Sequence, residues 1–278
     1  MKTIRTAKRG KFELRLIEKA GIYIGVVIAD AGGRVALIEG NDLEDTWQCL
    51  QGEAAKSARG YVGFAGARSR FIRFCPEGFS DRKFALDERN YKLSAKLKLD
   101  GSVPLEEAAA GRSGFGDAAL SVFYATNLLA PMEKAKLPDM LRGPSADALI
   151  SAIARFALAS DDAALHTMNA ILKLHDCAKW TIATYLPFLW RPDVHMFLKP
   201  QVTREFATRV GHPFVHDYKP QLDMSVYRSL LDLVRQTEQE LVTANLPPRD
   251  HIDIQSFIWV VSGYDELAPD AQPEYANA

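Results

Sequence analysis

Residues 12–41 read FELRLIEKAGIYIGVVIADAGGRVALIEGN, and this stretch decides the fold of the first part of the chain. Runs of apolar and β-branched residues alternate with short breaks at residues 20–21, 30–33 and 40–41, each of which contains glycine. Strand-length runs separated by glycine-rich turns are typical of an antiparallel meander, in which each strand pairs with the next. The stretch therefore predicts an N-terminal antiparallel β-sheet.

The remainder of the chain is mainly helical in pattern. Segments with helical spacing of apolar residues are 117–130, 145–158, 161–174, 177–187, 201–210, 224–244 and 252–262. The last of these is rich enough in β-branched and aromatic residues to be a strand instead. A glycine-rich loop, Gly111–Gly116, marks the passage between the two parts. We therefore predict an α+β protein with residues 1–112 forming an antiparallel sheet plus a basic helix and loop region, and residues 113–278 forming a helical catalytic domain.

The composition excludes several classes of protein. The chain has 278 residues, of which 47% are hydrophobic and 25% charged, as in an ordinary globular protein. Lys and Arg number 34 and Asp and Glu 35, so the overall charge of −1 does not by itself indicate a polyanion partner. Three cysteines are too few for a disulfide framework and suit a reducing compartment. No apolar stretch approaches the ~18 residues of a membrane helix, so we expect a cytoplasmic protein without membrane contact.

Positive charge is concentrated in residues 59–98, which hold ten Lys and Arg and four acidic residues. Within it, residues 68–74 read RSRFIRF, a mixture of bases and aromatic rings, and the helical stretch that follows has Lys92 and Lys96 along one side. Such a mixture favours a surface that contacts phosphates, although a solvated helix face and a loop would give the same pattern. The residues predicted to contact DNA are Arg68, Arg70, Arg73, Lys92, Lys96 and, further along the chain, Lys199.

The densest chemistry lies in residues 176–200. Lys179 begins an apolar, aromatic helix, and fourteen positions later Asp193 follows Pro192 in a turn that precedes the next helix. The simplest interpretation is a surface lysine and a carboxylate that favours the start of a helix. His212 and His216 have the spacing of metal ligands, but no cysteine pair completes a site, so we expect neither a metal nor another cofactor.

The turn Pro192-Asp193-Val194-His195-Met196 resembles the catalytic turn of the helix-hairpin-helix DNA glycosylases, in particular their 8-oxoguanine branch, where it reads Val-Asp-Val-His-Met. In that family the turn follows a helix that begins, in the bifunctional members, with a nucleophilic lysine. The family hairpin reads Leu-Pro-Gly-Val-Gly, and this chain has Leu174-His175-Asp176-Cys177-Ala178 there. The resemblance implies that Asp193 is the catalytic carboxylate, that Lys179 is a candidate nucleophile, and that the partner is double-stranded DNA with a flipped base.

These residue types suit base excision. Breaking an N-glycosidic bond builds positive charge on the sugar, which a nearby carboxylate stabilises. A lysine with a lowered pKa can attack the sugar carbon and form a Schiff base, and apolar walls would receive the extruded base. We place at this base pocket Trp180, Tyr185, Trp190, His195, Phe197, Asp253 and Gln255, for which core packing and helix capping are the plain alternatives.

The leading hypothesis is therefore a DNA glycosylase that removes a damaged base in repair, or a modified base of phage DNA in antiviral defence. The alternative is a non-catalytic nucleic-acid-binding protein that uses the basic segment 59–98. A third hypothesis is a helical interaction protein that binds no nucleic acid. Which base would be excised, and the oligomeric state, do not follow from these residues.

Overall fold

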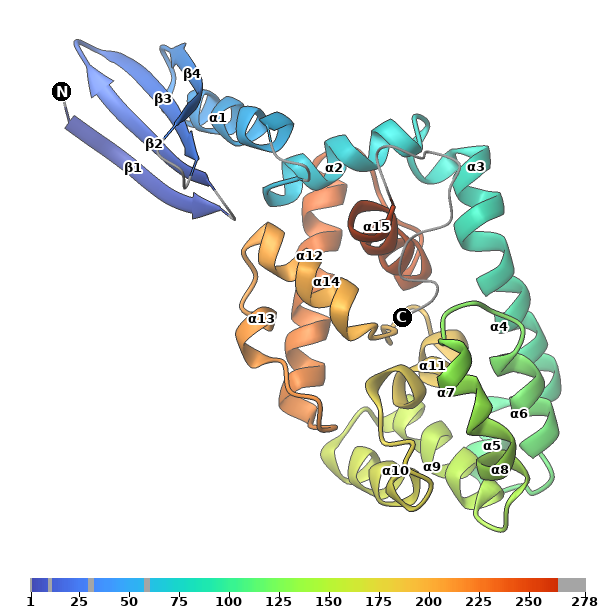
Figure 1. The fold of residues 1–278 in the computed structure, drawn as a ribbon. Helices are drawn as coiled ribbons and strands as arrows, with labels where there is room; N and C mark the ends of the chain where they lie inside the picture. Colours follow the sequence, from blue (N-terminus) through green and yellow to red (C-terminus); the bar gives the residue numbers. More distant parts are fainter. Residues whose placement is uncertain (1, 10–11, 30–32, 58–60, 265–278) are drawn as a thin grey trace.

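A computed structural model describes residues 2–9, 12–29, 33–57 and 61–264, and it confirms the predicted α+β class. A four-stranded sheet with one helix stands at one side of a larger helical body (Figure 1). Arg59, residues 30–32 of the predicted turn and residues 265–278 of the predicted second domain lie outside the described residues.

The sheet is the predicted meander, with each strand antiparallel to its sequence neighbour in the order β1-β2-β3-β4. Its strands are β1 (Lys2–Arg9), β2 (Phe12–Lys19), β3 (Ile22–Ala29) and β4 (Arg34–Gly40). Ala20 and Gly21, which join β2 to β3, have φ angles of 53° and 78°. Two consecutive residues in the left-handed region are what a two-residue hairpin turn requires.

One face of the sheet is covered by α1 (Leu43–Ser57). Leu14, Leu16 and Val27 point to this face and are fully buried together with Leu50 of α1. Gly25 lies directly beneath the helix, because a Cβ atom there would stand 2.9 Å from Cδ1 of Leu50. The sheet and α1 thus share a small core of their own.

The helical body follows. Its elements are α2 (Gly63–Phe74), η1 (Gly78–Ser80), α3 (Arg82–Phe84), η2 (Ala85–Arg89), α4 (Asn90–Ser102), α5 (Leu105–Ala109), α6 (Gly116–Phe123), α7 (Pro131–Ala135), α8 (Leu137–Arg142), α9 (Ala146–Ala159), α10 (Asp162–Leu174), α11 (Trp180–Trp190), α12 (Pro200–Val210), α13 (Phe214–Asp217), α14 (Met224–Thr243) and α15 (His251–Gly263). None of the described helices is both long and apolar enough to span a membrane.

Helix α11 lies at the centre of this body, and every one of its residues is buried. A helix that is apolar on all sides is stable only when other elements surround it, and α4 and α9 both contact it. The helix continues past Pro187, where the sequence predicts its end, to Trp190. The buried surroundings of α11 outweigh the missing backbone hydrogen bond at the proline.

The buried side chains form two separate clusters, which divide the chain differently from the predicted domains. One cluster runs from Leu14 to Ala54, and the other runs from Tyr61 to Val261. Residues 61–112 therefore pack with the helical body rather than with the sheet, because Phe71, Phe84 and Leu99 belong to its core. The predicted boundary at residue 112 is a connection between α5 and α6 inside one body.

The structure corrects one helical prediction and resolves the ambiguous one. The predicted helix 117–130 ends at Phe123. Residues 251–263 form a helix and not a strand, because the carboxylate of Asp250 accepts hydrogen bonds from the backbone amides of Ile252 and Asp253. A capping carboxylate satisfies amides that the first helical turn leaves unpaired.

Candidate nucleic-acid interface

The two predicted catalytic residues lie at opposite ends of α11. Lys179 is exposed at the N-cap, whereas Asp193 follows the C-terminal end. A helix of this length spans about 16 Å, so the structure does not bring the two side chains together. The side chain of Asp193 is 70% exposed, and its nearest charged partner is Arg191 at 3.8 Å. A carboxylate that faces solvent is not placed to stabilise charge in an enclosed site.

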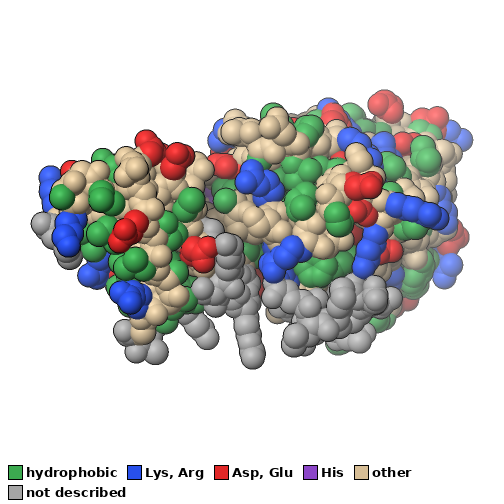
Figure 2. Space-filling model, turned by 90° about the horizontal axis from the view of Figure 1, so that it is seen from above, with side chains coloured by type: hydrophobic (Ala, Val, Ile, Leu, Met, Phe, Trp, Pro, Cys, Tyr) green, Lys and Arg blue, Asp and Glu red, His purple; other side chains and the backbone are tan. Residues whose placement is uncertain are grey.

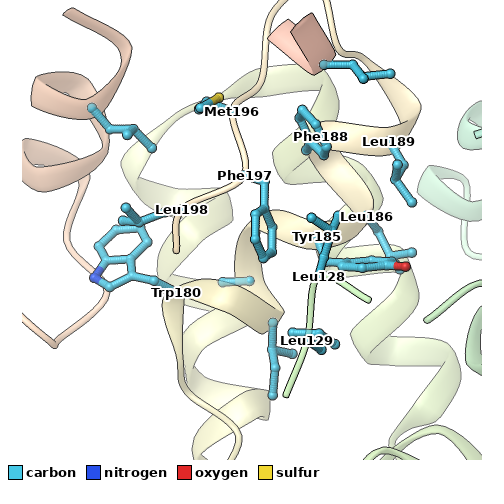
Figure 3. Close-up of a cluster of buried hydrophobic side chains, with 14 of the residues drawn as sticks. Leu128, Leu129, Trp180, Tyr185, Leu186, Phe188, Leu189, Met196, Phe197 and Leu198 are labelled. Atoms are coloured by element: carbon cyan, nitrogen blue, oxygen red, sulfur yellow. The ribbon is translucent and has the colours of Figure 1, made fainter. Parts of the chain in front are cut away.

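Three aromatic residues predicted to wall a base pocket are buried in the core instead. Trp180 and Tyr185 lie in the apolar cluster around α11 (Figure 3), and Trp190 is also buried. The indole N–H of Trp180 donates to the carbonyl of Lys219, the Tyr185 hydroxyl to that of Val122, and the indole N–H of Trp190 to that of Val103. Packing accounts for all three, which corrects the prediction.

His195 and Phe197 have structural positions too. The Nδ1 atom of His195 accepts a hydrogen bond from the Tyr227 hydroxyl at 2.8 Å, while Nε2 donates to the carbonyl of Ala157 at 2.9 Å. Burial lowers the pKa of His195 to about 4, so the ring is neutral at pH 7. Phe197 packs against the rings of Tyr185 and Phe188.

Asp253 belongs to a buried charge cluster, here defined as Glu88, Arg89, Lys92, Asp250 and Asp253. The carboxylate of Asp253 is fully buried and accepts a hydrogen bond from Arg89 at 2.7 Å. Arg89 also donates to both carboxylate oxygens of Asp250, at 2.8 and 2.7 Å. The cluster ties the start of α4 to the start of α15, so Asp253 does not read a base at a pocket rim.

The same cluster removes Lys92 from the predicted DNA surface. Its ammonium is fully buried and donates to Glu88 at 3.1 Å and to the Ser256 hydroxyl at 2.7 Å. Burial lowers the pKa of Lys92. A lysine without access to solvent cannot contact a DNA phosphate, so that prediction is wrong.

The other basic side chains of segment 59–98 are only partly accessible to a DNA partner. Arg70 is buried and donates to the carbonyl of Tyr264, and Lys96 donates to Asp100 at 2.8 Å and to the carbonyl of Trp190 at 3.1 Å. Arg68 is half-buried and Arg73 is exposed. On the face shown in Figure 2, Lys and Arg side chains are interspersed with acidic and apolar ones. The side chains drawn in colour on that face form no continuous basic surface.

A short turn, called the hairpin from here on, precedes Lys179. Helices α10 and α11 are joined by residues 175–179, in which the backbone amide of Cys177 bonds back to the carbonyl of Leu172 at 3.0 Å. Asp176 has a φ angle of 51°, in the left-handed region that favours glycine. Its carboxylate pairs with Lys136, which lowers the pKa of Asp176.

Exposed lysines gather beside this hairpin from separate segments of the chain. Lys136 pairs with Asp176, Lys173 lies in the last turn of α10, and Lys179 precedes α11. Lys219 is brought close because its carbonyl accepts from the indole of Trp180. We call Lys136, Lys173, Lys179 and Lys219 the hairpin lysines. No single stretch of sequence contains them, so charge counting along the chain missed them.

Lys199 lines a hollow, and the residue before it contacts α11. The amide of Leu198 donates to the Thr184 hydroxyl at 3.0 Å, which holds this segment against the helix. The Lys199 ammonium donates to the carbonyl of Leu128 at 3.3 Å and stands 5.4 Å from the centre of the Trp259 ring. Burial lowers the pKa of Lys199, and the charge of Glu133 acts in the opposite direction.

We call this hollow the Lys199 hollow. Its walls come from four separate segments of the chain. It is lined by Tyr91, Asn127, Leu128, Lys199, Gln255 and Trp259. The Gln255 side chain is buried, and its Oε1 atom has no hydrogen-bond partner among the described residues. The sequence analysis expected Gln255 at a base pocket and Lys199 on a surface that contacts DNA. Tyr91, Asn127 and Glu133 were not expected at a site, because no motif marks them in the sequence.

Comparison of the chain with models of known protein families, with curated proteins and with solved structures finds no match. Among the described residues, no group of three or more His, Cys, Asp or Glu side chains is close enough to hold a metal ion. The site therefore has to be interpreted from its own geometry.

Proposed function

We propose that this protein binds DNA through the hairpin between α10 and α11. The observation that supports this best is the backbone at Asp176. In the resemblance to the helix-hairpin-helix DNA glycosylases, Asp176 stands where the family hairpin has its first glycine, and its φ of 51° is a glycine-like conformation. Aspartate tolerates that conformation better than most other residues, so the absence of glycine does not prevent the hairpin turn.

The charge around the hairpin also supports DNA as the partner. Lys173, Lys179 and Lys219 are exposed, and clustered lysines attract a phosphate backbone. Helix α11 begins at the hairpin without a side-chain cap. Its first amides therefore add a partial positive charge at the same place.

The test compares two double charge reversals on a fluorescent duplex, with affinity measured by anisotropy over a range of salt concentrations. Lys173→Glu with Lys179→Glu removes two hairpin lysines, and the matched control, Arg82→Glu with Lys98→Glu, changes two exposed bases of segment 59–98. We expect the hairpin variant to lose at least tenfold in affinity and its salt slope to fall by about 1.8. Loss of binding only in the control would favour the segment 59–98 instead, and no binding by the unaltered protein would refute DNA binding.

Base excision is the second candidate function, and the electrostatic influence of an acid, Glu133, on Lys199 favours it. Glu133 accepts hydrogen bonds from the amide of Ala130 at 2.9 Å and from the Thr181 hydroxyl, and its charge acts on Lys199. A fixed carboxylate of this kind stabilises positive charge on a sugar. We propose Glu133 for this role in place of the solvent-facing Asp193. The protein would then act on cytoplasmic DNA, in repair or in defence against phage.

Base excision is tested by measuring abasic sites after the protein is incubated with DNA duplexes that contain an oxidised purine or a modified cytosine. Glu133→Gln should lower base release by about 100-fold, while Asp193→Asn should change it by less than about threefold, because an exposed charge is well screened. The reverse ranking would return the catalytic role to Asp193. A lack of product from every duplex would leave DNA binding as the function and exclude this second candidate.

A further inference from the structure

The two outer strands of the sheet differ in charge. Among the described strands β1 pairs only with β2, and β4 pairs only with β3 (Figure 1). The outer edge of such a strand carries backbone groups that can pair with a further strand. β1 holds four basic residues and no acid, so the β1 strands of two copies would repel each other. β4 reads RVALIEG, with a base at one end and an acid near the other.

β4 also exposes apolar side chains. Val35 is 39% and Leu37 is 48% exposed. Leu37 pairs with Val26 of β3, which alternates with Gly25 and Val27. Gly25 and Val27 face α1, and successive residues of a strand point to opposite faces. Val26 and its partner Leu37 therefore lie on the face that α1 does not cover, and neither belongs to the core of the sheet and α1.

Two copies of β4 match each other when they pair antiparallel about a two-fold axis through Leu37. An axis perpendicular to the sheet keeps the uncovered faces of both copies on the same side. This register pairs the whole of Arg34–Gly40 and sets Leu37 opposite Leu37 and Val35 opposite Glu39. A register one step away would set Leu37 opposite Ala36, which packs on the α1 side, and residues that oppose each other must share a face.

The same register brings opposite charges together. Arg34 pairs with Ile28 of β3 and Glu39 pairs with Ile24. Residues four apart on a strand share a face, so the two charged side chains lie on one face. In the paired copies Arg34 of each lies diagonally across from Glu39 of the other, within reach of long side chains. Both are exposed, and neither has an ion-pair partner among the described residues.

We propose that two copies of this chain associate through the outer edge of β4, so that their two sheets become one continuous antiparallel sheet. The same residues of each copy meet across the two-fold axis, as in other isologous dimers. An interface made by one strand edge is small, so the association should be reversible and dependent on concentration. It does not depend on the proposed DNA binding, because the hairpin lies in the helical body.

The first test is sedimentation equilibrium of the full chain over a range of concentrations. We expect the apparent mass to rise from 30.9 kDa towards twice that value. Leu37→Lys should weaken association by about tenfold or more, because it sets two like charges against each other on the axis. Leu97→Lys, at an exposed leucine of α4, should have no effect. A monomer mass at every concentration, or equal association of the two variants, would overturn the proposal.

The second test exchanges the charges of β4. Arg34→Glu and Glu39→Arg should each weaken association by about tenfold, because the symmetric interface loses two ion pairs and gains two repulsions. The double variant should recover the original affinity to within about threefold, because the exchanged charges attract again. Lys2→Glu on β1 should have no effect. Single variants that weaken association without recovery in the double variant would contradict the proposed register, provided that circular dichroism shows all of them folded.

The third test is disulfide trapping in a Cys49→Ser background, which removes the exposed cysteine. Opposing residues of antiparallel strands have Cα atoms about 4.5–5.5 Å apart, which suits a disulfide. With oxidised glutathione, Leu37→Cys should therefore give a covalent dimer on a non-reducing gel, and Thr6→Cys on β1 should not. Equal trapping of the two variants would show that β4 is not the interface.

Discussion

The buried charge cluster and the hairpin lysines are both rich in charge, but they use it differently. Arg89 and Lys92 donate to Asp253 and Glu88 inside the protein, with 9% or less of the basic side chains exposed. Lys173 and Lys179 remain exposed at the hairpin. The first set stabilises the contact between α4 and α15, and the second is available to a partner. Density of charge along a sequence therefore does not predict the charge of a surface.

Helix α4 shows the physical reason. Lys92 points into the core, whereas Leu97 is 70% exposed. This is the reverse of the usual amphipathic arrangement, and it is possible because Glu88 and Ser256 supply partners for the buried ammonium. Which face of this helix is buried therefore depends in part on Ser256, which lies 164 positions further along the chain.

The largest effect should come from breaking the buried charge cluster. Asp253→Ala leaves Arg89 without one buried partner, and we expect a loss of about 3–5 kcal/mol in the free energy of unfolding, measured by urea denaturation. Asp193→Ala, at an exposed carboxylate, should change it by less than about 0.5 kcal/mol. Similar losses for the two variants would mean that the cluster contributes no more than a surface charge does.

An intermediate effect on stability should come from His195, which is buried as a neutral ring rather than in an ion pair. Its folded pKa of about 4 lies below the ordinary 6.5, so the unfolded chain binds the proton more readily as the pH falls below 6.5. Stability should therefore be full above pH 6.5 and should decrease between pH 6.5 and 4, by roughly 2 kcal/mol at pH 5. Urea denaturation at pH 7.5 and 5 measures this, and His195→Gln should show a smaller difference between the two pH values.

The smallest effect should come from the hairpin backbone. Asp176→Gly relieves the left-handed conformation and should raise the melting temperature by about 1–3 °C, while Asp176→Val should lower it, because a β-branched residue is poorly tolerated at positive φ. DNA affinity should follow the same order if the turn positions the hairpin lysines. A Val variant with unchanged stability and affinity would show that the turn geometry is unimportant.

Local patterns were enough to predict the sheet and most helices. The glycine at position 21 indicates the β2–β3 turn, and the apolar spacing of 224–244 closely matches α14. The site was less predictable. The sequence drew attention to Lys199 and Gln255, but it also paired Lys179 with Asp193, which α11 holds apart. Tyr91 and Asn127 reach the hollow only through tertiary packing, which no local pattern encodes.

The two separate cores described above have a consequence for how the molecule melts. Leu14, Val27 and Trp47 share no core with Phe71 or Phe188, so the sheet with α1 can lose its order while the helical body keeps its own. Differential scanning calorimetry should then resolve two heat-absorption peaks, and the smaller one should come from the sheet with α1. Ligands of the hairpin would shift only the larger peak.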